Sequence, residues 1–404
     1  MLRPLIIANP DVSGGGAFRR SFEVLRRAKR HGIEPVIVVP MDYIRNRHYV
    51  DVLKNEYKVH ILKAHGPLHA LRGALYPFKT YYALFNYAYQ LIKSTGLRDE
   101  LREVDLVVSH HEEPQYELIA YSLAHRSKVP WTALIQLHHC VPTFSLQRSS
   151  LKRLYTIINN YVANYLNWRV LNTTTMLVVG LSVVYEFKER GFPLNKYIVL
   201  KPPVGINLDV VRESKPLSEA YDAVYFARLI PEKGVFDVLK VWHFVRKVIP
   251  RAKLCVMGRF ENKIHERKFF EVIRDLNLSE NVVYKGFVSE HLKYSVLKSS
   301  KVMVYPSLLD AFPTVVVEAL ACGLPVITYN VPFTLNFETH AIIRVRTKDY
   351  RSMAEAIIEL LHDEELCKKL SNEAITYAAN FTWDNVVKAE KEAYLKILNE
   401  YTNY

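Results

Sequence analysis

The sequence predicts an α/β fold with two doubly wound domains, each built on a parallel sheet. A chain of 404 residues is longer than one hydrophobic core usually supports, so two domains are expected. Short runs rich in β-branched residues alternate with amphipathic helical stretches in both halves of the chain. Because these runs lack polar/apolar alternation, they are typical of strands that are buried on both faces of a parallel sheet.

The first half contains five runs of this kind. They are "PLIIAN", "PVIVVP", "KVHIL", "DLVVSH" and "WTALIQL". Residues 17–31 between the first two predict a helix, because Phe18, Phe22 and Leu25 fall on one face. We expect the basic residues of this helix to point away from that apolar face; they are Arg19, Arg20, Arg26, Arg27, Lys29 and Arg30.

The second half repeats the pattern with "AVYFARL", "AKLCVMG", "VVYKGFV", "VMVYP" and "PVITYN". Two prolines and a glycine in "KPPVGINLD" (residues 201–209) interrupt the alternation, so we place the boundary there. The predicted domains are residues 1–205 and 206–382. Residues 383–404 predict a final helix with Thr382 as its N-cap, expected to pack back on the first domain.

Charge is unevenly distributed along the chain, whose net charge is +13. Residues 1–205 hold 27 Lys and Arg against 15 Asp and Glu, whereas residues 206–404 hold 27 against 26. This excess predicts an anionic partner for the first half: a lipid surface, a phosphorylated acceptor or nucleic acid. A solvated basic surface without a partner is the other interpretation. No RNA- or DNA-binding motif accompanies the charge, which argues against nucleic acid.

Cysteine usage and apolar run lengths indicate a cytoplasmic protein. The four cysteines occur singly, without a CxxC spacing, which is typical of reduced thiols. The longest apolar runs, such as residues 176–185, are shorter than the ~20 residues of a membrane-spanning helix. The first residues lack the pattern of a signal peptide and predict a strand instead.

Three segments combine strand ends, glycines and charges. "NPDVSGGGAFRR" (residues 9–20) places glycines before a helix, where backbone N–H groups can meet an anion, although Arg19 breaks the dinucleotide fingerprint and a plain turn is an alternative. "ARLIPEKGVFDVL" (residues 227–239) offers Arg228 and Lys233 to a phosphate; the alternative is a surface ion pair with Glu232. "DAFPTVVVEALACGLP" (residues 310–325) brackets buried valines with Asp310 and Glu318 at the ligand-binding edge of the sheet.

Two histidine pairs end strands of the first domain. His110 and His111 follow "DLVVS", and His138 and His139 follow "WTALIQL", so both pairs are expected at the carboxyl edge of the sheet, facing a cleft between the domains. A zinc site with Cys140 is disfavoured, since adjacent residues rarely bind one metal. No DxD pair exists to hold a metal–diphosphate, and we expect no metal or cofactor.

In this order the motifs resemble the large retaining glycosyltransferase family 4 (glycosyl transferases group 1), with its GT-B fold of two Rossmann-like domains facing each other across a cleft. The resemblance is strongest over residues 227–326, with "ARLIPEKG", "VVYKGFV" and "SLLDAFPTVVVEALACGLPVI". Weaker matches are "GGGA", "LHH", "VVGLS" and "PVGIN". It implies a UDP- or GDP-sugar donor bound mainly by the second domain, and metal-independent transfer of a hexose to a glycan or to a lipid-linked or phosphorylated acceptor.

Motif matching carries the family's catalytic roles to four residues. Arg228 and Lys233 would hold the donor diphosphate, Asp310 would face the sugar ring, and His138 would point at the transferred sugar. Glu318 would accept hydrogen bonds from the ribose hydroxyls. The rest of the implied donor-binding set comprises Val288 beside the base, Gly16 where the first domain closes on the phosphates, Thr314 and Val315 through their N–H groups, and Gly15, Phe312 and Pro313.

The sequence departs from the family pattern at three places. Asp310 stands where the family usually has Glu, Ala311 replaces the Gly that follows, and "VGIN" replaces the "NGVD" of the hinge. The shorter acid puts donor identity in doubt. The alternatives are a GT-B phosphorylase, a nucleotide-sugar epimerase, or a nucleotide-sugar-binding protein without turnover.

Three basic and aromatic stretches of the first domain bear on the acceptor. They are the helix of residues 17–31, "YPFKTYYALFNYAYQLIK" (76–93) and "SLKRLYTIINNYVANYLNWRVL" (150–171). Such surfaces suit an anionic membrane interface. The sequence therefore predicts a peripheral protein at the inner face of a membrane, with core helices as the alternative for the second and third stretches.

Overall fold

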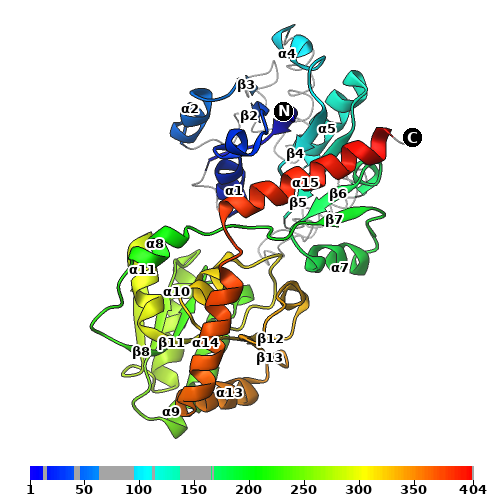
Figure 1. The fold of residues 1–404 in the computed structure, drawn as a ribbon. Helices are drawn as coiled ribbons and strands as arrows, with labels where there is room; N and C mark the ends of the chain where they lie inside the picture. The colour runs from blue at the N-terminus through cyan, green and yellow to red at the C-terminus, as the bar shows by residue number, and fades with distance from the viewer. Residues whose placement is uncertain are drawn as a thin grey trace. The chain divides into compact units, whose positions relative to one another are not determined.

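The computed structural model describes residues 1–11, 16–40, 46–62, 95–111, 114–136, 165 and 168–402. The chain forms two compact units, Met1–Val204 with Trp383–Tyr404, and Gly205–Thr382. Each unit is a parallel β-sheet covered by helices (Figure 1). The predicted α/β class with two parallel sheets is thus confirmed.

Among the described residues of the first unit, seven strands form its sheet: β1 (Pro4–Ile7), β2 (Val36–Pro40), β3 (Val59–Leu62), β4 (Leu106–Ser109), β5 (Trp131–Ile135), β6 (Met176–Val178) and β7 (Tyr197–Val199). They pair in parallel in the order β3-β2-β1-β4-β5-β6-β7. The order reverses between β1 and β4. Open α/β sheets bind ligands at the carboxyl ends of strands at such a switch point.

Helices of the first unit follow the strands, as parallel pairing requires. They are α1 (Gly16–Leu25), the short 3-10 helix η2 (Ala28–His31), α2 (His48–Lys54), α4 (Thr95–Glu100), α5 (Pro114–Ser127), α7 (Leu181–Glu189) and the C-terminal α15 (Trp383–Thr402). Helix α15 belongs to this unit although it ends the chain, and it packs against α1.

The second unit has six strands: β8 (Tyr221–Phe226), β9 (Leu254–Met257), β10 (Val282–Gly286), β11 (Ser300–Tyr305), β12 (Val326–Tyr329) and β13 (Ile342–Val345). Their order is β10-β9-β8-β11-β12-β13, again in parallel, with the reversal between β8 and β11. Strands β9 and β12 and the ends of β8 and β11 are almost wholly apolar because helices cover both faces.

The helices of the second unit are α8 (Leu208–Glu213), η6 (Pro231–Lys233), α9 (Val235–Val248), α10 (Lys263–Asp275), α11 (Glu290–Lys298), α12 (Thr314–Ala321), η7 (Pro332–Asn336), α13 (Tyr350–His362) and α14 (Glu364–Ala378). Within the described part of the chain, no helix combines the length and the apolar character needed to cross a membrane.

All ten predicted strands are confirmed, as β1–β5 and β8–β12. Strands β6, β7 and β13 were not predicted. Strands β6 and β7 have only three residues each, too few to establish a pattern, and Arg344 interrupts the apolar run of β13. Strands β6, β7 and β13 join their sheets because the neighbouring strand offers backbone N–H and C=O groups that need hydrogen-bond partners.

The prediction that Arg20 points to solvent is wrong. The predicted helix breaks into α1 and η2, and Arg20 is fully buried. Its Nη1 lies 2.5 Å from Oε1 of Glu390 on α15, and its Nε donates to the carbonyl of Pro203. Arg26, Lys29 and Arg30 are exposed as expected. A buried guanidinium needs a paired charge. Its partner Glu390 lies 370 residues further along the chain, so no local sequence pattern could indicate the pair.

Glu390 is the centre of a buried network that joins α15 to the first sheet. Tyr394 donates a hydrogen bond to its Oε2 over 2.8 Å, and His110 Nε2 lies 3.6 Å from the same oxygen. Burial by itself would raise the pKa of Glu390, but Arg20 and His110 overcome this effect and lower the pKa to about 2. The carboxylate therefore stays charged at neutral pH, opposite Arg20.

We expect Glu390→Leu to destabilise the first unit by about 3–5 kcal/mol in urea unfolding, because it leaves Arg20 buried without a counter-charge. The double variant Arg20→Met/Glu390→Leu should recover most of the loss. Since the folded pKa of Glu390 lies below its ordinary 4.5, the pair stabilises above pH 4.5 and fades as pH falls towards 2. The double variant should show less of this acid sensitivity; a single variant as stable as the wild type would contradict the assignment.

Candidate functional site

The site in the second unit forms where the order of its sheet reverses. Strand β8 leads into η6, and β11 leads into the loop before α12, so both loops leave the same edge side by side. Gly234, with φ 79°, ends η6, and a Cβ at this position would clash with the carbonyl oxygen of Pro306. Leu308 N donates to the carbonyl of Glu232 over 2.9 Å. The two loops are therefore held in direct contact.

Lys233 and Asp310 meet across these two loops. Lys233 Nζ lies 2.6 Å from Asp310 Oδ2 and donates a second hydrogen bond to the carbonyl of Leu309 over 2.8 Å. The surface pair of Lys233 with Glu232, considered from the sequence, is absent from the described residues; Lys233 pairs across the loops instead. Both charged groups are largely buried, so neither the attraction nor the local field is strongly screened by water.

Tyr305 holds the carboxylate of Asp310 from the other side. Its hydroxyl donates to Asp310 Oδ2 over 2.6 Å. Burial, and then the charge of Asp310, raise the pKa of Tyr305 well above its usual range, so it remains a donor at any working pH. This residue was not predicted. A tyrosine that ends an otherwise apolar buried strand, directly before a proline, is the pattern that could have indicated it.

Arg228 is the second predicted cation of the site. It lies two residues after the end of β8 and is exposed. Within the described part of the chain it makes no ion pair. A guanidinium at the switch point without a carboxylate partner remains available to an anion, and its fork suits the oxygens of a phosphate.

The N-terminus of α12 adds backbone donors at the same edge. Pro313 occupies the N-cap position, and Thr314 and Val315 begin the helix. The N–H of Val316 bonds the carbonyl of Pro313, whereas those of Thr314 and Val315 have no acceptor among the described residues. Free N–H groups at a helix start favour an anion. Phe312 is buried against Phe337, with ring centroids 4.8 Å apart, which anchors the turn.

Glu318 lies just over one turn into α12 and is buried, not solvated. Its Oε1 accepts hydrogen bonds from Lys293 Nζ over 2.7 Å and from the Tyr294 hydroxyl over 3.4 Å. Its Oε2 accepts no hydrogen bond from the described residues. Val316 and Val317, which precede it, are buried in the core. The valines thus orient the helix, while one carboxylate oxygen remains open.

Lys293 was not predicted as a site residue. It lies on α11 among the buried residues Tyr294 and Leu297, with its side chain only 9% exposed. A lysine on the apolar face of an amphipathic helix implies a buried acid as its partner, but no local pattern could identify Glu318.

Val288 follows β10, three strands from β11 along the same edge. Strands lie ~4.8 Å apart, so Val288 is roughly 14 Å from the Asp310 loop along this edge. It is half-buried, and the neighbouring Phe287 is 79% exposed. The edge therefore offers an elongated surface, with cations at the switch point and apolar groups towards its end.

In the first unit the predicted site residues are only partly described. Gly15 and His138 lie outside the described residues, as do His139 and Cys140. Gly16 begins α1, and a Cβ there would meet no described atom within 4 Å.

The first histidine pair does not face a cleft as predicted. His110 and His111 follow β4, but both are buried within the first unit. Burial, with the neighbouring His110, lowers the pKa of His111 to about 3, and its ring lies 4.8 Å from that of Phe18. Both imidazoles are core groups. Among the described residues, no three His, Cys, Asp or Glu side chains gather in a way that could hold a metal ion.

We expect Lys293→Met to destabilise the second unit by about 3–5 kcal/mol, because the Glu318 carboxylate would remain buried without its cation. Lys301→Met is the matched control. Lys301 forms an exposed pair with Asp222 at 3.4 Å, so its loss should cost at most about 1 kcal/mol. Urea unfolding of the two variants measures the difference, and equal losses would show that Lys293 does not balance a buried charge.

Comparison with known proteins finds a family match within the second unit. Residues 210–377 match the family model described as "Glycosyl transferases group 1". This segment is less than half of the chain and includes every described residue of the site just built except those of the first unit.

Relatives and solved structures extend the likeness beyond that segment. An uncharacterized glycosyltransferase of Methanocaldococcus jannaschii is 23% identical over 363 residues, 78% of this chain and 84% of that protein. The poly(glycerol-phosphate) alpha-glucosyltransferase of Bacillus subtilis is 28% identical over 178 residues, 42% of this chain but only 25% of that protein. The structure of Anabaena HepE in complex with UDP and glucose aligns with a TM-score of 0.69 over 97% of this chain and 99% of its own, at 13% identity, which shows a common fold.

The matched segment contains Arg228, Lys233, Asp310 and Glu318, and the fold likeness covers both parallel sheets. Residues 210–377 of the second unit therefore match the glycosyl transferases group 1 family model, and the chain has the two parallel-sheet domains of the GT-B fold.

Proposed function

We propose that this protein is a glycosyltransferase, which transfers a hexose from a UDP- or GDP-linked donor to a glycan or to a lipid-linked or phosphorylated acceptor, with retention at the anomeric carbon. The observation that carries the proposal is the convergence of Arg228, Lys233 and the start of α12 at one switch point. Together they offer two cations and two free N–H groups to a single anion.

The diphosphate of the donor binds this convergence. When the bond between the anomeric carbon and the diphosphate breaks, its electron pair stays on the leaving nucleoside diphosphate. Arg228, Lys233 and the N–H groups of Thr314 and Val315 stabilise that charge. They are placed before the reaction begins, so no reorganisation is needed as the charge develops. In this proposal Arg228 and Lys233 stabilise the negative charge of the diphosphate, so no metal ion is needed for that role.

The nucleoside extends along the edge towards Val288. Glu318 Oε2 accepts hydrogen bonds from the ribose hydroxyls, while Lys293 and Tyr294 hold the other carboxylate oxygen. A UDP complex of HepE, a protein with the same fold, supports a nucleotide in this family of structures. The base, uracil or guanine, lies beyond the ribose near Val288.

Asp310 orients the hydroxyls of the transferred sugar and offsets the positive charge that develops on its ring. The acceptor oxygen attacks the anomeric carbon from the face that the diphosphate leaves, and the acceptor proton passes to the departing phosphate oxygen. This sequence retains the anomeric configuration without a covalent sugar–enzyme bond. His138 remains a predicted contact of the sugar, and Gly15 and Gly16 remain predicted neighbours of the phosphates.

We propose an acceptor that is phosphorylated or lipid-linked because the basic excess lies in the first half of the chain. Arg26, Lys29 and Arg30 give α1 and η2 an exposed basic surface in the described residues. The Bacillus subtilis relative is named for a poly(glycerol-phosphate) acceptor, which supports an anionic one. Residues 76–93 and most of residues 150–171 lie outside the described residues, so their part in this surface remains a prediction.

A thermal-shift screen of UDP-, GDP- and ADP-sugars, each with and without EDTA, tests the donor site. We expect stabilisation by a UDP- or GDP-sugar that EDTA does not remove, because the cations of the protein hold the diphosphate. Lys233→Ala should abolish this shift and lower turnover about 100–1,000-fold. Lys301→Ala, at the opposite edge of the same sheet, is the matched control and should keep both.

Three outcomes would contradict the proposal. Loss of the shift with EDTA would show that a metal holds the diphosphate. An unchanged shift in Lys233→Ala would place the donor elsewhere. Product analysis gives the third: free sugar phosphate would indicate a phosphorylase, and an epimerised donor would indicate an epimerase, whereas a glycoside of retained configuration supports the transfer.

Sedimentation with vesicles that contain anionic lipid, at low salt, tests the membrane contact. Each basic residue near such a surface contributes about 1 kcal/mol, so replacing Arg26, Lys29 and Arg30 with Gln should weaken binding about 100-fold. The matched control replaces three exposed basic residues of α10 in the second unit, Lys263, Arg267 and Lys268. If the wild-type chain ignores the vesicles, or both triple variants lose binding equally, the first-unit contact is wrong.

A further inference from the structure

A hollow of about 890 Å³ opens in the first unit at the amino-terminal edge of its sheet. It is lined by the start of β5, the turn before β6, the residue before β7, and the C-terminal parts of α5 and α15. The switch-point residues of this sheet follow the carboxyl ends of β1 and β4 instead. Strand β5 has five residues, so its two ends lie roughly 15 Å apart. The hollow is therefore separate from the ligand-binding edge.

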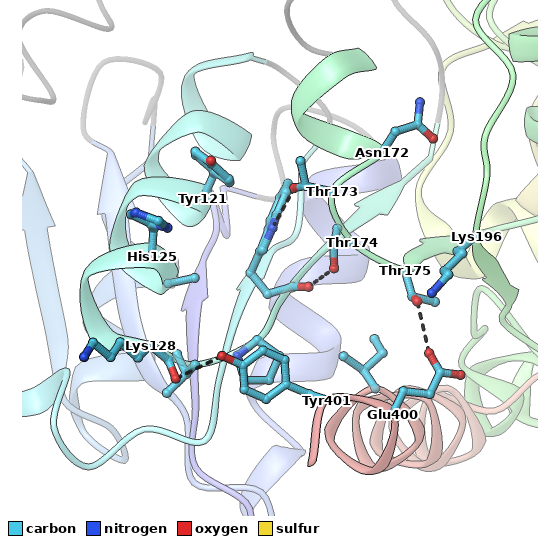
Figure 2. Close-up of a pocket in the computed structure, with 15 residues that line it drawn as sticks. Tyr121, His125, Lys128, Asn172, Thr173, Thr174, Thr175, Lys196, Glu400 and Tyr401 are labelled. Atoms are coloured by element: carbon cyan, nitrogen blue, oxygen red, sulfur yellow. Dashed lines mark hydrogen bonds between the residues drawn. The ribbon is translucent and has the colours of Figure 1, made fainter. Parts of the chain in front are cut away.

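Aromatic side chains supply flat surfaces in this hollow. Figure 2 shows Tyr121, His125 and Lys128 along one helix, with Tyr401 reaching towards them from α15. The Tyr401 hydroxyl donates to the carbonyl of Lys128 over 3.3 Å, while its side chain remains 50% exposed. The rings of Tyr121 and His125 are stacked, with centroids 6.0 Å apart. Trp131 packs edge-on against Tyr121, with ring centroids 5.9 Å apart.

The aromatic groups are held in place by hydrogen bonds. Trp131 Nε1 donates to Thr173 Oγ1 over 3.3 Å, and Thr173 Oγ1 in turn donates to the carbonyl of Val170. Lys128 directly follows α5 with φ 57°, a left-handed conformation in which glycine is far commoner. The carbonyl that Tyr401 bonds belongs to this turn. The aromatic side of the hollow is therefore preformed in the absence of a ligand.

Polar groups of both signs face the same space. Thr175 Oγ1 donates to Glu400 Oε2 over 3.2 Å, and Lys196 lies beside them in Figure 2. His125 and Lys128 are exposed on the other side. Donors and acceptors are therefore available together, within reach of the aromatic rings.

The charges argue against an anionic ligand. Helices α5 and α15 both direct their C-terminal parts at the hollow, and the C-terminus of a helix carries partial negative charge. Glu400 adds a full negative charge. A phosphate or carboxylate would meet these as well as the lysines. A wholly apolar ligand is equally unsuited, because it would remove the charged groups of Lys196 and Glu400 from water without replacing their hydrogen bonds.

We propose that this hollow is a second, non-catalytic binding site for a neutral glycan segment. Sugar rings present apolar C–H faces that pack on aromatic rings, and their hydroxyls both donate and accept hydrogen bonds, which matches the mixed lining. The volume is in the range of pockets that enclose small-molecule ligands. A glycan held here leaves the carboxyl edge of the sheet free, and raises the local concentration of a long chain near the protein.

Calorimetric titration of the full chain with neutral oligosaccharides tests the site. The probes are maltoheptaose, cellohexaose and a chitin tetramer, with an oligomer of galacturonic acid as the anionic comparison. We expect at least one neutral probe to bind at millimolar concentration or below, and more tightly than the acidic oligomer. Tyr401→Ala should weaken that binding about tenfold or more, as expected for a lost aromatic contact.

Two control variants separate this site from others. Tyr185→Ala removes a similarly exposed tyrosine from α7 of the same unit, outside the hollow, and should leave the affinity unchanged. Lys233→Ala disables the proposed donor site and should also leave the oligosaccharide affinity unchanged. Failure of the glycan-site inference can therefore be distinguished from failure of the transferase proposal. The inference is wrong if no neutral probe binds, if the acidic oligomer binds as tightly, or if Tyr401→Ala and Tyr185→Ala behave alike.

Discussion

The close contact between the loops after β8 and β11 is the constraint on which the rest of the second unit's site depends. Gly234 has no room for a Cβ against Pro306, and this contact brings Lys233 within 2.6 Å of Asp310. A larger residue at position 234 would separate the loops and with them the cation and the acid. The reversal of strand order places the two loops next to each other at one edge of the sheet, and Gly234 allows them to come into contact.

The same contact explains how a shorter acid serves this site. Asp310 is one methylene shorter than the family's usual Glu, yet both Lys233 and Tyr305 reach its Oδ2. In this state Asp310 is the counter-ion of Lys233. A donor diphosphate would offer Lys233 a second anion, so binding exchanges one ionic partner for another and does not expose an unpaired charge. The protonated Tyr305 keeps Asp310 in position through that exchange.

Buried ion pairs have different roles in the two units. Arg20 and Glu390 join helices from opposite ends of the sequence, and their role is to attach α15 to the first unit. Lys293 and Glu318 also form a buried pair, but Glu318 retains an open oxygen at the edge where the donor is proposed to lie. Replacement by apolar residues is therefore tolerable in the first case, whereas in the second it would remove the proposed ligand contact as well as a charge.

The sequence by itself determined the α/β class and ten of the strands, and it predicted that Arg228, Lys233, Asp310 and Glu318 belong to one site. Apolar runs and the order of motifs can be recognised in the sequence alone. Only the tertiary structure decided the partners of these residues: Asp310 for Lys233, Lys293 for Glu318, and Glu390 for an arginine expected in solvent. Partners of buried charges are set by which helices and loops pack together, and no spacing along the chain encodes that contact. The hollow beneath Tyr401 likewise arises from five segments that are distant in sequence.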